Sequence, residues 1–188
     1  KVAYEGRLDI RAHAFANGAG PIEGNLRAEL TDAQLRRTRS KTRQDLIRLG
    51  SGTVTVSADR NALRSAFALD ANDLGTVSGE LTAQRAGYAL TDMPLRGSIK
   101  AATRELDFVN IYVPDIDRAT GKLLADIAIG GTAGRPAISG LLQLSDGEFD
   151  FYQVNLQLRK VAMQARVNDN RVEFSGGAQA AEGKLDAR

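Results

Sequence analysis

The chain has 188 residues, a net charge of +2 at pH 7, one histidine, no cysteine and no tryptophan. Without cysteine it can form no disulfide, and it offers neither a thiolate nucleophile nor a thiolate metal ligand. The small net charge indicates no polyanionic partner, and 19 glycines against 5% aromatic residues predict an apolar surface of small and aliphatic side chains.

The two ends of the chain both carry strand patterns. Residues 2–10 already alternate, and a new alternating segment begins at Lys184. There is no signal peptide and no apolar run long enough to span a bilayer. We therefore expect residues 1–188 to be one segment of a larger protein.

Apolar and polar residues alternate along most of the chain, with the period of a β-strand. Leu8 and Ile10 alternate with Arg7, Asp9 and Arg11. The same period returns in the segments that contain Leu26, Val54, Val77, Leu123, Val154, Val161 and Val172. Glycine-, asparagine- and aspartate-rich turns separate these segments. The pattern predicts an all-β fold of about ten to twelve antiparallel strands, with one wet face and one apolar face.

Residues 31–50 break this alternation and are locally basic. They include Arg36, Arg37, Arg39, Lys41, Arg43 and Arg48. We predict a mobile basic loop here, with contact to anionic lipid headgroups as a second interpretation. Nucleic acid is not an expected partner, because no aromatic residues are interleaved with the charge.

Residues 103–113 also depart from the strand period. Leu106, Val109 and Val113 have helical spacing, Thr103 can cap a helix and Pro114 can end one. The spacing predicts a short amphipathic helix that packs on one end of the sheet. A movable plug over the apolar face is the alternative.

No pattern in the chain predicts catalysis. The single histidine, His13, lies on the polar side of its segment, so neither a metal site nor a catalytic triad can be completed around it. Asp115 and Asp117 lack the further ligands of a calcium loop. We therefore expect no enzymatic activity, no metal and no cofactor.

Something must cover an apolar sheet face. Packing against itself as a β-sandwich is the plain interpretation. The scarcity of aromatic residues and the many Ala, Val, Ile, Leu and Gly residues favour instead a smooth wall that suits hydrocarbon. Composition alone leaves both interpretations open.

The segment 121–151 has an ordered series of turn residues between strands. Gly131 and Thr132 are followed by Pro136, Gly140 and then Asp146-Gly147. In this order and spacing the segment resembles the C-terminal conserved domain of the TamB family, and the resemblance extends over residues 106–177.

This resemblance implies an open antiparallel sheet folded into a taco-like, U-shaped groove with an apolar interior. It also implies a periplasmic segment of an inner-membrane-anchored protein of a Gram-negative bacterium. Such a protein carries phospholipid acyl chains between the two membranes and supports outer-membrane protein assembly. The implied partners are phospholipid, a TamA-like outer-membrane barrel protein and outer-membrane protein clients.

The apolar positions of the alternating segments are the expected groove lining. They are Leu8, Ile10, Leu26, Val54, Val56, Leu81, Leu123, Ile127, Ile129, Leu142, Leu144, Phe149, Phe151, Val161, Met163, Val172 and Phe174. The alternative function is a protein-interaction module that pairs an exposed strand edge with a partner by β-strand augmentation.

Overall fold

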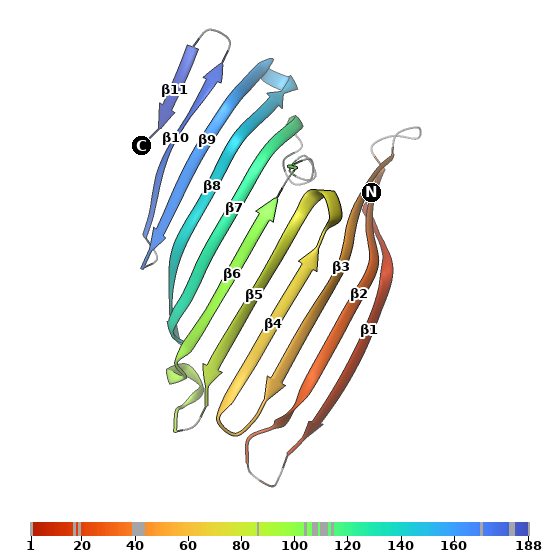
Figure 1. The fold of residues 1–188 in the computed structure, drawn as a ribbon, viewed down its shortest axis with the longest axis vertical. Helices are drawn as coiled ribbons and strands as arrows, with labels where there is room; N and C mark the ends of the chain where they lie inside the picture. Colours follow the sequence, from red (N-terminus) through yellow and green to blue (C-terminus); the bar gives the residue numbers. More distant parts are fainter. Residues whose placement is uncertain are drawn as a thin grey trace. The chain divides into compact units, whose positions relative to one another are not determined.

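The computed structural model describes residues 2–16, 18, 20–38, 44–85, 87–103, 105–106, 109, 113, 115–169, 171–180 and 183–187. In this part of the chain, eleven strands form one open antiparallel sheet (Figure 1). Their order in the sheet is their order in the sequence, so each strand pairs with the strands before and after it. The predicted all-β fold is confirmed.

The strands are β1 (Val2–Phe15), β2 (Glu23–Thr38), β3 (Gln44–Ala58), β4 (Ala62–Asp70), β5 (Gly75–Gln84), β6 (Leu95–Thr103), β7 (Ile116–Thr132), β8 (Arg135–Phe151), β9 (Leu156–Asn168), β10 (Arg171–Ala180) and β11 (Gly183–Ala187). Three short 3₁₀ turns, η1 (Asn72–Leu74), η2 (Leu90–Asp92) and η3 (Tyr152–Val154), lie between strands. Among the described residues no helix is long and apolar enough to cross a membrane.

The contacts divide the chain into two compact units. The first comprises Lys1–Asn72, Thr76–Ile99 and Ala128–Ala137. The second comprises Asp73–Gly75, Lys100–Ile127 and Ile138–Arg188.

In the first unit the strand register aligns apolar residues in rows. Ile10 pairs with Ala28, Ala28 with Val54, and Val54 with Phe67. Rows on either side of this one contain Leu8 with Leu30 and Leu26 with Val56. Because successive side chains of a strand point to opposite faces, these rows form one apolar face and the intervening charged residues form the other.

In the second unit two β-bulges keep the apolar residues on one face. Leu144 pairs with Met163, whereas Gly147 pairs with Val161. Asp146 and Lys160, with φ of 53° and 48°, lie in these irregular stretches. One extra residue in β8 and one in β9 keep the apolar side chains before and after each bulge on the same face, where strict alternation would place them on opposite faces.

The expected basic loop at residues 31–50 is corrected by the structure. Strand β2 continues through Thr38 and β3 begins at Gln44, so residues 31–38 and 44–50 are strand. Residues 39–43 lie outside the described part. The register shifts between Leu30 and Gln34, which breaks the period on which the sequence interpretation depended. Arg36 is accommodated by an ion pair with Glu5, with its Nη2 3.0 Å from the carboxylate Oε2.

The helix predicted over residues 103–113 falls largely outside the described residues. Thr103, its expected cap, ends strand β6, and its Oγ1 accepts a hydrogen bond from the Leu123 amide at 3.0 Å. The Val109 amide donates to the Leu106 carbonyl at 2.8 Å, and the Val113 amide donates to the Val109 carbonyl at 2.9 Å. The second of these bonds has the i to i+4 spacing of an α-helical turn.

Candidate functional site: an exposed apolar sheet face

The apolar face of the first unit is open to solvent over much of its area. Ile10 is 59% exposed and Val54 43%, and Phe67 also counts as exposed. Leu26, Val56 and Leu81 are half-buried. In a packed core such aliphatic side chains are nearly always inaccessible. This face is therefore not the sealed interior of the unit.

The apolar face of the second unit is similar near β10. Val172 is 46% exposed, and Met163 and Phe174 are exposed as well. By contrast, Val161 on the same face is 5% exposed. Leu8 in the first unit is 59% exposed, like Ile10. The other expected lining residues are half-buried: Leu123, Ile127, Leu142, Leu144, Phe149 and Phe151 in this unit, and Ile129 in the first.

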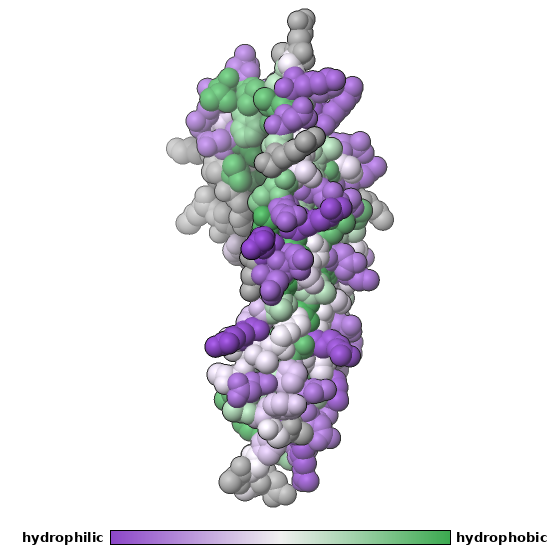
Figure 2. All heavy atoms as spheres, turned by 90° about the vertical axis from the view of Figure 1, so that its left-hand side faces the viewer, coloured by the Kyte–Doolittle hydropathy of each residue, from purple (hydrophilic) through white to green (hydrophobic). Residues whose placement is uncertain are grey.

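Charged and polar residues occupy the opposite face of the strands. Asp126 and Gln143 are exposed there, as expected from the alternation. Arg27 and Glu29 form an ion pair at 2.6 Å on strand β2. Figure 2 shows apolar residues reaching the surface beside rows of hydrophilic ones. In most strands the two faces thus differ in what they offer to a ligand.

Strand β4 contributes lining residues that the sequence interpretation missed. Leu63, Phe67 and Leu69 pair with Ala83, Gly79 and Val77 on the apolar face. Their other-face neighbours Ala62, Ala66 and Ala68 are also apolar, so the contrast of the alternation is weak there. The large residues Leu63, Phe67 and Leu69 all lie at odd-numbered positions, and this spacing could have placed them on one face of the strand.

Leu158 was missed for a different reason. It pairs with Phe149 and lies on the same side as Val161, although three residues separate the two in the sequence. Strict alternation would place them on opposite faces, and the bulge at Lys160 brings them together.

Part of the second unit's apolar face is covered by the chain itself. Leu106, between β6 and β7, is 4% exposed and forms a buried cluster with Ile116 and Ala119. The half-buried residues packed against this cluster are Val109, Leu123, Leu144, Phe149 and Phe151. Four of the expected lining residues are therefore in contact with the protein's own side chains at this end of β7 and β8.

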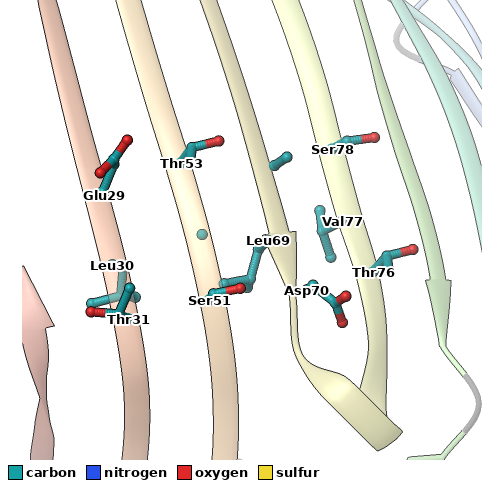
Figure 3. Close-up of a pocket in the computed structure, with 12 residues that line it drawn as sticks. Glu29, Leu30, Thr31, Ser51, Thr53, Leu69, Asp70, Thr76, Val77 and Ser78 are labelled. Atoms are coloured by element: carbon teal, nitrogen blue, oxygen red, sulfur yellow. The ribbon is translucent and has the colours of Figure 1, made fainter.

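Each unit also has a pocket. In the first unit it has a volume of about 340 Å³ and is lined by residues of β2 to β5, among them the apolar Leu30, Leu69 and Val77 and polar residues such as Glu29 and Thr53 (Figure 3). In the second unit a pocket of about 460 Å³ lies across β7 to β10, and most of its lining residues, such as Gln143, Gln164 and Ser175, belong to the polar side of their strands. Leu124, which faces away from the apolar side and is 51% exposed, contributes to its lining.

The hairpin between β3 and β4 contains a cluster of polar interactions. Asp59 Oδ1 accepts hydrogen bonds from the amides of Asn61 and Ala62 at 2.7 and 2.8 Å. Arg64 donates to Asp59 Oδ2 at 2.6 Å. These interactions, the Arg64 hydrogen bond foremost, lower the pKa of Asp59 from 3.8 to about 2. The cluster holds the strand ends, and all its charges are paired.

In the second unit, Arg159 forms a corresponding structural pair. Its guanidinium donates to Asp150, and this hydrogen bond raises the pKa of Arg159 above its usual value. Asp150 is thus half-buried in an ion pair. Among the described residues no group of three or more potential ligands could hold a metal ion.

Comparison with known proteins gives one match. A family model described as "TamB, N-terminal domain" matches residues 1–144, which is more than half of the chain. No curated protein and no solved structure matches. The expected family is supported, but the expected C-terminal conserved domain is wrong. The turn residues on which that resemblance depended recur between the strands of any hairpin-built sheet, so they do not distinguish one part of such a protein from another.

Proposed function

The chain belongs to the TamB family, and from this premise we propose that its apolar sheet face carries phospholipid acyl chains while their headgroups remain in water. The chain would act as a periplasmic segment of an inner-membrane-anchored protein of a Gram-negative bacterium. Its cargo would move between the inner and outer membranes, and its partners would be a TamA-like barrel protein and outer-membrane protein clients.

The observation that carries the proposal is the exposure of large apolar residues in rows across neighbouring strands. Ile10, Val54 and Phe67 are exposed on one face of the first unit, and Val172 and Phe174 on one face of the second. Burying a methylene group is worth about 0.8 kcal/mol, so an acyl chain gains binding energy along such a face without any polar contact.

The chemistry of these residues also suits a moving ligand. The rows consist mostly of Leu, Ile, Val, Ala, Phe and Gly, and the row from Ile10 to Gly79 contains no charged group. A wall of this kind offers similar affinity at successive positions, since hydrophobic attraction is non-directional and scales with area. A chain can therefore slide along the face without leaving one tight site for another.

Site-specific photo-crosslinking in cells tests the proposal. A photo-crosslinking residue is placed at Ile127, on the apolar side of β7, and separately at Asp126, the adjacent exposed position on the polar side, in the full-length protein. We expect phospholipid to be captured at position 127 and not at position 126. If neither position captures lipid while both variants remain folded, the lipid-carrying proposal is wrong.

The open edges of the sheet favour a second candidate function. Strands β1 and β11 each have a neighbour on one side only in the described part of the chain. An unpaired edge presents backbone N–H and C=O groups that a strand of a client or barrel partner can bind. In that case a proline in β1, such as Arg11→Pro, abolishes partner crosslinking while polar substitutions on the apolar face leave it unchanged.

A further inference from the structure

Large side chains lie over glycines of the adjacent strand at several places on the apolar faces. A Cβ atom on Gly52 would stand 3.0 Å from Leu69 Cδ1, and one on Gly79 would stand 2.6 Å from Phe67 Cε1. Three further pairs repeat this arrangement: Gly97 with Leu81, Gly147 with Val161, and Gly176 with Met163. Both units therefore contain such pairs.

The strand register makes most of these contacts direct cross-strand pairs. Gly52 is the partner of Leu69 and Gly79 is the partner of Phe67. Side chains on a sheet ordinarily stand roughly perpendicular to it. The missing Cβ leaves room for Leu69 to reach sideways from β4 toward β3 (Figure 3). The large residues consequently lie along the sheet, and they project less into the space above it.

We infer that these glycines set the clearance of the apolar face, because they let the large side chains lie flat and allow an acyl chain to approach the strands closely. The inference rests on the proposed function. Glycine in a strand interior weakens the strand, so its repeated use beneath large residues indicates a requirement for close approach.

Gly52 is the position at which this inference can be tested most cleanly. The nearest obstacle to a side chain there is the flexible end of Leu69, and the nearest backbone atom, Ala68 O, would be 3.2 Å away. A leucine at this position would therefore lift Leu69 off the sheet with little disturbance of the strands. By contrast, Gly79 has the backbone oxygen of Ser98 at 2.9 Å, so a side chain there would also press on β6.

The experiment measures phospholipid capture in cells by a photo-crosslinking residue that replaces Val77, the cross-strand partner of Leu69. In the full-length protein we expect Gly52→Leu to lower this capture several-fold. Gly130→Leu is the matched control, since no heavy atom lies within 4 Å of the added Cβ there. The exchange of the pair, Gly52→Leu with Leu69→Gly, conserves composition and should restore capture.

The outcomes separate the inference from the proposed function. Capture that is present and unaffected by Gly52→Leu overturns the clearance inference and leaves the lipid-carrying function standing. Absence of capture in the unsubstituted protein overturns both. Protease resistance in the same cells reports folding: a loss of capture that the folded exchange variant fails to restore also counts against the role of clearance.

Discussion

At the scale of single residues, individual side chains have unequal parts in holding the sheet together. The described part of the chain has few buried apolar residues, and Leu106 and Val161 are two of them. Most large aliphatic residues remain half-buried or exposed. The stability of the protein should therefore depend on a small number of buried positions and on the polar clusters at strand ends.

Replacing Leu106 tests the importance of the buried cluster. We expect Leu106→Ala to lower the free energy of unfolding by about 2 to 5 kcal/mol, because it removes buried methylenes and leaves a cavity. The matched control, Leu124→Ala, changes an exposed leucine on the other face and should cost within about 0.5 kcal/mol. Urea unfolding of the purified protein measures both, and equal effects would contradict this assignment.

The lowered pKa of Asp59 predicts how the stability of the protein depends on pH. Its folded-state pKa of about 2 lies below the ordinary value of 3.8, so the ionised carboxylate stabilises the folded state. This contribution is fully present above the ordinary value and is lost as the pH falls through the folded one. We expect Asp59→Asn to flatten the dependence of the melting temperature on pH in that window. Asp126→Asn, at an exposed strand position, serves as control.

At the scale of elements, the exposure of the apolar face differs from one strand to the next. On β9, Val161 is almost inaccessible, while Val172 on β10 remains half open to solvent. The two residues have the same chemistry and belong to the same unit. A charged substitution that is tolerated at one of these positions and not at the other therefore shows which apolar position is closed to solvent.

We expect Val172→Asp to leave the protein folded and Val161→Asp to unfold it. A charge at position 172 stays hydrated, whereas one at position 161 has no buried partner and must lose its water. Far-ultraviolet circular dichroism and thermal unfolding distinguish the two variants. If both unfold, the apolar face of the second unit is a packed core, and the lipid-carrying proposal loses its basis there.

At the scale of the whole molecule, the proposed function predicts that lipid binding is driven by the hydrophobic effect. The chain has a net charge of only +2, and the lining residues that face a ligand are uncharged. Attraction to headgroups should thus contribute little, because exposed charges are screened by salt while burial of hydrocarbon is not.

This predicts how bound lipid responds to solution conditions. Full-length protein extracted from membranes should retain phospholipid, detected by mass spectrometry, through a wash at about 1 M salt, where the Debye length is about 3 Å. A competing apolar detergent should displace it. Loss of lipid in salt alone would instead indicate that basic residues, such as those of β2, hold the headgroups.

Much of the fold could be predicted from the period of the sequence. Alternation assigned the strands around Leu8, Leu26, Val54 and Leu142. It failed where bulges change the register, as at Leu30 to Gln34, and where both faces are apolar, as in β4. Alternation is a local signal. One inserted residue reverses which of the following side chains face the apolar side, and the composition of the segment does not reveal it.

The sequence by itself determined that this chain is an antiparallel sheet with one apolar and one polar face, since the facing of each side chain follows from the geometry of a single strand. Only the tertiary structure decided which apolar residues are covered. Val161 and Val172 look alike in sequence, yet one is buried and the other exposed. Burial depends on what lies above a residue, and segments distant in the chain supply that cover, as Leu106 does for Phe149.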